Sequence, residues 1–112
     1  MIRGEIYFAN LDPTMGSEIK KNRPVLIVSN NANNKPASTI TIIPITSNVT
    51  KIFPFEVLLE TAHSQLLKIS KAQCYQIRTI SKIRISGKKV GQVDNEIMNR
   101  IVAALKLHLD IM

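Results

Sequence analysis

Two aliphatic runs separated by a polar segment constrain the fold more than any other feature of the chain. The runs are PVLIVS, residues 24–29, and TITIIPIT, residues 39–46, and NNANNKPAS lies between them. β-branched side chains favour strands, and Asn suits turns. The pattern predicts an antiparallel hairpin whose first strand is central, because both of its faces are apolar. Pro24 suits the first residue of a strand, whereas Pro44 suggests an edge or a bulge.

The register of this hairpin determines what meets at its open end. If the midpoint lies between Asn34 and Lys35, the numbers of paired residues sum to 69, and Arg23 then faces Thr46. A bulge in the long connection would shift the register by a residue, yet the two ends would still meet. We therefore expect a guanidinium and a hydroxyl to converge at one rim of the sheet.

The rest of the chain predicts further strands followed by one helix. Strand-like stretches occupy residues 4–10, 54–60, 68–81 and 88–93. A loop follows the first of them, and the last two supply two or three strands between them. Asp94 is the expected N-cap of a helix with apolar residues at helical spacing from Ile97 to Leu109. We expect one domain, residues 1–112, that is mainly β with a C-terminal α-helix and folds as a small twisted sheet or barrel.

The charge distribution predicts an acidic partner. The formal net charge is +7, and residues 61–93 hold seven basic residues and no Asp or Glu. Such a surface suits the phosphates of a nucleic acid or an acidic protein segment. A merely solvated basic surface is the alternative. The seven residues are Lys68, Lys71, Arg78, Lys82, Arg84, Lys88 and Lys89.

Other patterns disfavour several classes of protein. No apolar run approaches the roughly 18 residues of a membrane span, and MIRGEIYF lacks the features of a secretion signal, so we expect no membrane association and a cytoplasmic location. Cys74 is the single cysteine, and no Cys/His cluster has metal-ligand spacing, so neither a metal nor a cofactor is expected. We interpret Cys74 as a small core residue, His63 as a surface residue and His108 as a packed one.

The chemistry of Arg23 and Thr46 suits phosphoryl transfer. A planar guanidinium can hold two phosphate oxygens and stabilise charge that grows in the transition state, while a threonine hydroxyl can orient the phosphate. Such a pair needs no metal. The alternative is structural: Arg23 extends along the strand, and Thr46 is an ordinary strand residue.

Several motifs in order then identify a family. The stretches GEIYFANLDPTMGSE, RPVLIVSN, PITSN and QIRTISK, followed by a terminal helix, resemble the MazF, PemK and Kid toxin endoribonucleases of the CcdB/PemK superfamily. The resemblance implies a homodimer of small SH3-like β-barrels, the CcdB/MazF/Kid toxin fold. It also implies a type II toxin that is neutralised by an antitoxin with an acidic, flexible C-terminal segment.

The resemblance further implies metal-independent, sequence-specific cleavage of single-stranded messenger RNA, which inhibits translation and growth. In the family's chemistry the ribose 2′-hydroxyl attacks the adjacent phosphorus, so RNA rather than DNA is the substrate. By motif, Arg23 is the principal catalytic residue and Thr46 orients the phosphate. The motif positions that line the presumed RNA groove are Glu18, Ser47, Gln76 and Arg78.

Three positions depart from the family pattern. Tyr75 stands where some members carry an acidic residue proposed as a base, and Gln73 stands where Kid-like members have arginine. Ile19 replaces a glutamine able to read a base edge. The identity of the general base therefore stays open, and the cleavage sequence cannot be copied from a relative. Tyr75, within the basic region, is the best sequence candidate for stacking on a base.

Two other functions stay open at this point. One is a non-enzymatic poison of DNA gyrase like CcdB, although the tryptophan at the gyrase-binding end of CcdB has no counterpart in this chain, which lacks Trp. The other is a catalytically degenerate member that only binds RNA or antitoxin, a reading that Tyr75 and Gln73 motivate. Incubation with single-stranded RNA in EDTA separates both from a nuclease.

Overall fold

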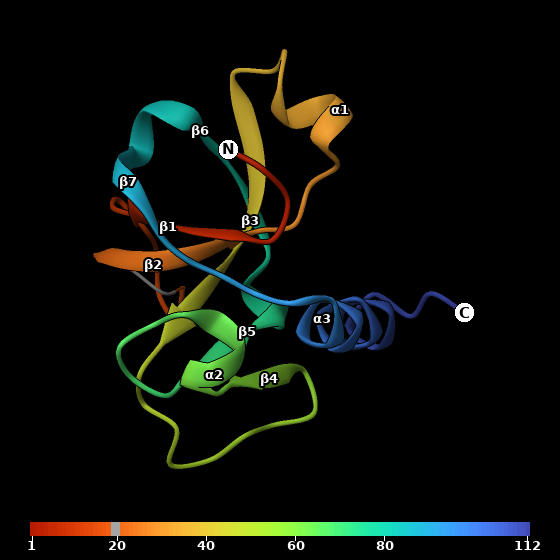
Figure 1. Cartoon of the computed structure of the whole chain (residues 1–112). Helices are drawn as coiled ribbons and strands as arrows, with labels where there is room; N and C mark the ends of the chain where they lie inside the picture. The colour runs from red at the N-terminus through yellow and green to blue at the C-terminus, as the bar shows by residue number, and fades with distance from the viewer. Residues whose placement is uncertain (19–20) are drawn as a thin grey trace.

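A computed structural model describes residues 1–18 and 21–112 of the chain. The elements alternate short strands with single helical turns and end in one long helix (Figure 1). The strands are β1 (Glu5–Asn10), β2 (Asn22–Ile27), β3 (Thr39–Thr46), β4 (Glu56–Leu59), β5 (Ser70–Gln73), β6 (Arg78–Ser81) and β7 (Ile85–Gln92). The helices are α1 (Asn31–Asn34), α2 (Thr61–Ser64) and α3 (Asn95–His108), and the 3₁₀ turns are η1 (Cys74–Gln76) and η2 (Lys82–Arg84).

The seven strands form one antiparallel sheet organised around β3. The order is β4-β5-β3-β2-β1-β7, and β6 pairs with β3 beside this path. Among the described residues no pairing joins the two ends, β4 and β7, so the sheet is open. The mainly β architecture with a C-terminal helix is confirmed, whereas closure into an SH3-like barrel is not confirmed.

The predicted hairpin register is confirmed. β2 and β3 pair through Val25 with Pro44, Leu26 with Ile43 and Ile27 with Ile42, and each pair of numbers sums to 69. β2 lies between β3 and β1, so its predicted central position is also confirmed.

The polar connection and Pro44 differ from expectation. The connection contains the helical turn α1, because the Asn30 side chain caps it by accepting from the Ala32 N–H. β3 is central rather than an edge strand. Pro44 is tolerated there because β3 pairs with β6 up to Ile42 and with β5 from Ile45 onward. The residue without an N–H therefore falls where the partner strand changes.

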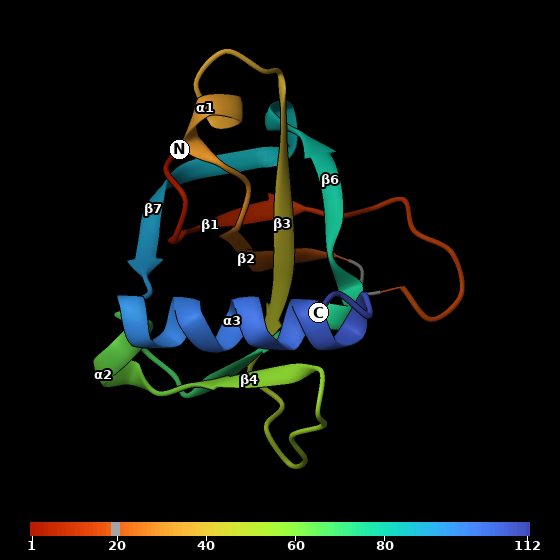
Figure 2. The ribbon, with the colours of Figure 1, turned by 90° about the vertical axis from the view of Figure 1, so that its right-hand side faces the viewer.

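Two hydrophobic cores lie on the two faces of the sheet. Figure 2 shows α3 running across the molecule between β4 and the part of the sheet formed by β1 and β2. The core under α3 includes Ile6, Leu26, Ile43, Ile45, Leu59, Ile97 and Ile101. The core on the other face comprises Ala9, Leu11, Val25, Ile27, Ile40, Ile42 and Ile80. Neighbouring buried residues along β1, β2 and β3 therefore alternate between the two cores, as side chains on a strand point to opposite faces.

The start of α3 is fixed by the predicted cap. Asp94 Oδ1 accepts from the Ile97 N–H at 2.9 Å, and Asp94 Oδ2 lies 2.5 Å from His63 Nδ1 on α2. The hydrogen bond to Asp94 raises the pKa of His63, and the same bond lowers the pKa of Asp94. α2 is thereby joined to α3.

No helix in the described part of the chain is long and apolar enough to cross a membrane.

β7 passes very close to α2. A Cβ on Gly91 would lie 2.5 Å from the Ser64 carbonyl oxygen and 3.3 Å from Ile6 Cδ1. A backbone oxygen cannot move aside as a flexible side chain would, so only glycine fits here. This approach positions the segment between α2 and β5 beside β1 and β7, where the candidate site lies.

Candidate active site at the open end of the hairpin

A cavity of about 590 Å³ opens where β2 begins and β3 ends. Arg23 of β2 and Thr46 at the end of β3 both line it, and the β2–β3 ladder ends two residues from them, at Val25 and Pro44. Ser47, immediately after β3, lines it too. The structure therefore brings three of the predicted site residues to one cavity.

The backbone of Arg23 is held by β1. Arg23 pairs with Ala9 across the β1–β2 ladder, and the β2–β3 ladder ends two residues away, at Val25 and Pro44. Arg23 is half-buried. A side chain that starts from the middle of a sheet has little freedom at its base, which suits a group that must act on one atom of a substrate.

Thr46 lies in front of a buried ion pair. It pairs with Lys71 of β5, whose Nζ lies 3.0 Å from Glu56 Oε1 and donates to the Lys51 carbonyl at 2.9 Å. The side chains of Lys71 and Glu56 are 9% and 1% exposed. The Thr46 hydroxyl itself accepts a 3.3 Å hydrogen bond from the Asn48 N–H. The ion pair ties the β3–β4 loop to β5 directly behind the cavity.

The polar lining of the cavity is cationic and hydroxylic. Two segments contribute the cations: Lys21 and Arg23 come from the start of β2 and the residue before it, and Lys68 comes from the segment before β5. The hydroxyls come from Thr46, Ser47 and Ser70. Among the described residues that line it there is no carboxylate, imidazole or thiol. Nor does the described part of the chain hold a group of three or more His, Cys, Asp or Glu side chains placed to bind a metal ion. The arrangement favours binding and stabilising a phosphate by charge and hydrogen bonds.

The other three predicted site residues lie along the β1–β2 loop and not at this cavity. Glu18 Oε1 accepts from the Met15 N–H at 2.6 Å within that loop. Gln76 Nε2 donates to the Ser17 carbonyl at 3.4 Å, and an Arg78 guanidinium N–H donates to the Leu11 carbonyl at 3.3 Å. The structure thus splits the predicted set into two groups. The prediction for Ile19 lies outside the described residues.

The comparisons with known proteins decide the family. Residues 2–109 match the model of the PemK-like, MazF-like toxins of type II toxin–antitoxin systems. The chain belongs to this family. As a MazF-like toxin it is 41% identical to endoribonuclease MazF9 of Mycobacterium tuberculosis, over 99% of this chain and 98% of that one. It is 34% identical to endoribonuclease EndoA of Bacillus subtilis, over 96% and 92% of the two chains.

Solved structures show the same fold. MazF from Deinococcus radiodurans superposes with a TM-score of 0.85 at 21% identity, covering 98% of this chain and 96% of that one. A mycobacterial endoribonuclease, solved in complex with its cognate antitoxin, superposes with a TM-score of 0.81 at 25% identity and covers 100% and 97%. The open antiparallel sheet with a C-terminal helix is therefore the MazF fold.

Two positions where this MazF-like toxin departs from the family pattern, Gln73 and Tyr75, lie away from the cavity. Tyr75 is 39% exposed, and its hydroxyl accepts from Gln73 Nε2 at 3.1 Å. Neither residue lines the cavity. Gln73 Oε1 and Glu56 Oε2, on residues paired across β4 and β5, are buried and have no hydrogen-bond partner among the described residues. The tyrosine hydroxyl is thus engaged with its neighbour on the surface of β5 and η1.

The two histidines and the cysteine occupy the non-catalytic positions that the sequence predicted for them. The His108 ring packs edge-on against Phe55, with centroids 5.2 Å apart. Burial, with a contribution from the charge of Glu56, raises the pKa of Cys74 to about 12, so the thiol is not an available nucleophile. His63 lies at the surface, as expected: its side chain is 38% exposed in the helical turn α2, where Asp94 holds it.

Sequence reasoning did not assign Phe8 or Lys21 to the site, although both line the cavity. Lys68 was predicted only as one of seven basic residues able to bind phosphates, because charge alone did not separate it from its neighbours. Tyr7 and Phe8 point to opposite faces of β1, and no pattern in the sequence tells which of the two rings is left uncovered. Arg84 belongs to the same basic stretch. What the sequence did not predict is that its guanidinium donates to the carbonyls of Asn10 at 3.1 Å and Asp12 at 2.6 Å and so anchors the β1–β2 loop.

Proposed function

We propose that this MazF-like toxin cleaves single-stranded RNA at the cavity, with Arg23 as the principal catalytic residue and Thr46 as the group that orients the phosphate. Family membership and relatives at 34–41% identity that are endoribonucleases support the activity. One observation carries the assignment to residues. Arg23 and Thr46, a guanidinium and a hydroxyl, line the same cavity, whose described lining has cations and no carboxylate.

The proposed reaction is an internal transfer of the phosphate. The ribose 2′-oxygen forms a bond to phosphorus while the bond from phosphorus to the 5′-oxygen breaks. The 2′-hydroxyl loses its proton, the departing 5′-oxygen takes one up, and the products are a 2′,3′-cyclic phosphate and a 5′-hydroxyl. Extra negative charge collects on the phosphate oxygens at the transition state, and a guanidinium can hold two of them at once. No metal ion is required.

The cationic lining bears on the unassigned general base. Because the described lining has no carboxylate, we expect stabilisation of the charged phosphate to account for a larger share of the rate enhancement. The proton of the 2′-hydroxyl is then accepted by water or by a group outside the lining. Arg23 remains charged at all working pH values and therefore acts as a charge stabiliser or proton donor rather than as a base.

The substrate is proposed to extend beyond the cavity. Ser47 adds a hydroxyl next to Thr46 for the same phosphate. Glu18, Gln76 and Arg78, which meet along the β1–β2 loop, form the second part of the groove and would contact bases or phosphates further along the strand. Because these contacts come from the loop, its sequence is proposed to set which bases are accepted.

Two protein partners are proposed with this activity. One is a second copy of the chain, which would form the homodimer of SH3-like barrels implied by the resemblance. The other is an antitoxin whose acidic, flexible C-terminal segment occupies the RNA groove. The antitoxin is supported by the basic stretch at residues 61–93 and by relatives of this fold solved as MazE–MazF complexes. Messenger RNA as the substrate places the proposed activity in the cytoplasm, with inhibition of translation as its result.

The test is an RNA cleavage assay in EDTA with purified protein. We expect metal-free cleavage that leaves cyclic-phosphate ends, and a loss of about 10²- to 10³-fold in kcat for Arg23→Ala. Arg100→Ala is the matched control, because Arg100 is exposed on α3, pairs with Glu96 in its own helix and does not line the cavity. Retained activity in Arg23→Ala would refute the assignment. No cleavage by the wild type would favour a gyrase poison or a degenerate member.

A further inference from the structure

Phe8 is the single aromatic residue among the described residues that line the cavity. It is 38% exposed, whereas Ile6, two residues earlier on the same face of β1, is fully buried. Ile6 belongs to the core under α3, and Phe8 does not. A large apolar ring is thus left uncovered at the mouth of a cavity that also holds Arg23.

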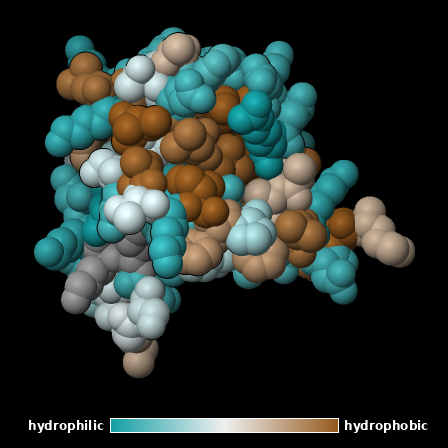
Figure 3. Space-filling view, turned by 90° about the horizontal axis from the view of Figure 1, so that it is seen from below, coloured by the Kyte–Doolittle hydropathy of each residue, from teal (hydrophilic) through white to brown (hydrophobic). Residues whose placement is uncertain are grey.

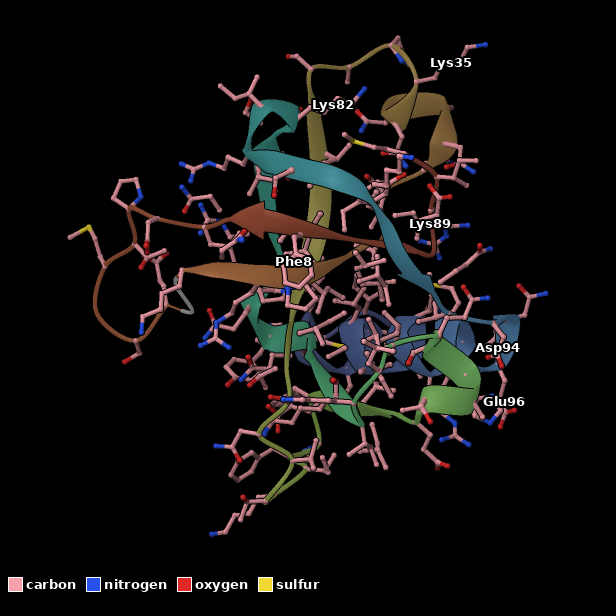
Figure 4. All side chains as sticks on the ribbon, turned by 60° about the vertical axis from the view of Figure 1, so that its left-hand side comes forward. Phe8, Lys35, Lys82, Lys89, Asp94 and Glu96 are labelled. Carbon is pink, nitrogen blue, oxygen red and sulfur yellow. The ribbon has the colours of Figure 1, made fainter. Side chains whose placement is uncertain are left out.

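The surroundings of Phe8 hold its backbone firmly and leave its ring accessible. Its backbone pairs with Pro24 of β2 and with Ser86 of β7, so the residue sits in a central strand. Figure 4 shows the ring beside β2, apart from the acidic start of α3 at Asp94 and Glu96. A ring on a rigid strand loses little freedom when a flat ligand lies against it.

The rest of the apolar lining makes the cavity a place for a flat, uncharged group. Leu66, Leu67 and Val90 line it together with Phe8, and Leu67 is fully exposed. Figure 3 shows hydrophobic residues gathered on the face seen from below, the side on which α2 and the segment that joins it to β5 lie in Figure 1. The cavity therefore offers both cations and apolar side chains, which suit the phosphate and the base of a nucleotide.

We propose that Phe8 stacks on the nucleobase next to the phosphate held at Arg23, which makes it a substrate-positioning residue. The inference rests on the proposed function. Proteins that bind single-stranded RNA commonly stack unpaired bases on aromatic rings, and a stack works for any base because each has a flat π-face. Phe8 takes over the role that the sequence suggested for Tyr75, which is exposed but does not line the cavity.

The kinetic test compares side chains at position 8. Removing a stacked ring weakens single-strand binding by roughly 5- to 150-fold, so Phe8→Ala should raise KM for RNA by a factor in that range. Phe8→Tyr should rescue most of the effect. Phe8→Leu keeps an apolar side chain but no flat ring, and it should stay close to Phe8→Ala. A Phe8→Leu enzyme with wild-type KM would overturn the proposal, and far-ultraviolet circular dichroism checks that each variant is folded.

A spectroscopic test reads the stack directly. The chain has no Trp, so Phe8→Trp introduces a single reporter. The probe is a uniformly 2′-O-methylated copy of an RNA that the wild type cuts, which binds but cannot react. We expect saturable quenching of the Phe8→Trp emission, and no change for Tyr75→Trp or for Phe53→Trp, which lies in the exposed β3–β4 loop.

The outcomes separate this inference from the proposed function. If the wild type does not cut RNA, the proposed function fails. If it cuts RNA and depends on Arg23, but probe binding leaves the Phe8→Trp emission unchanged, only the stacking proposal fails. Emission that responds to dilution and not to the probe would show that a second copy of the chain covers Phe8, and this result would also overturn the proposal.

Discussion

Lys71→Met should destabilise the fold strongly because it leaves a buried carboxylate without its counter-ion. Lys71 Nζ is 3.0 Å from Glu56 Oε1 and 2.9 Å from the Lys51 carbonyl oxygen. Glu56 Oε1 also accepts from the Phe53 N–H at 2.9 Å, while Glu56 Oε2 has no partner among the described residues. The carboxylate therefore relies on Lys71 for its only positive charge in an environment that is almost closed to water.

The magnitude follows from this burial. Breaking a buried ion pair by removing one partner costs about 3–5 kcal/mol, and the lost hydrogen bond to the Lys51 carbonyl adds about 1 kcal/mol. A domain of this size has a total stability of roughly 5–15 kcal/mol, so Lys71→Met should lower the midpoint of thermal unfolding by at least about 10 °C. Because Lys71 pairs with Thr46, RNA cleavage should fall as well.

The assay is urea unfolding followed by circular dichroism, analysed as a double-mutant cycle. Lys71→Met combined with Glu56→Leu should recover much of the loss, since the double variant no longer buries a charge. Lys106→Met is the control, because Lys106 is exposed on α3. If Lys71→Met unfolds within about 0.5 kcal/mol of the wild type, the pair is not buried as the structure shows and the reasoning is wrong.

Two further predictions concern the contacts of α2. Gly91→Ala should cost about 1–3 kcal/mol in unfolding free energy, because its Cβ would lie 2.5 Å from the Ser64 carbonyl oxygen; wild-type stability would mean that the two segments are further apart. His63 has a raised pKa and Asp94 a lowered one, so their pair should stabilise the fold between them, losing its effect as pH rises through the raised pKa of His63 or falls through the lowered pKa of Asp94. His63→Gln should flatten unfolding free energy against pH near neutrality, and an unchanged profile would contradict this.

Local patterns in the sequence determined the framework of the site. The branched runs and the symmetric polar segment between them were enough to predict that residue numbers in the hairpin sum to 69, and the structure confirms this register. The N-cap at Asp94 was equally readable. Both features depend on residues close together in the chain, where backbone propensity and side-chain alternation decide the outcome.

Features that depend on distant segments were not readable in the same way. Pro44 suggested an edge strand, yet β3 is central, because β6 and β5 pair with its two halves and leave a gap at the proline. The six predicted site residues divide between the cavity, which Arg23, Thr46 and Ser47 line, and the β1–β2 loop, to which Gln76 and Arg78 hydrogen-bond.

What the sequence by itself determined is therefore the register of the hairpin whose open end lines the cavity, the helix that follows Asp94, and the resemblance to the MazF family. Only the tertiary structure decided which other side chains share that cavity. Ile6 and Phe8 lie on the same face of β1, but Ile6 is buried in the core that also holds Ile97 and Ile101 of α3, whereas Phe8 is 38% exposed. The reason is physical: exposure depends on where a covering layer ends, and the layer here comes from residues more than fifty positions away.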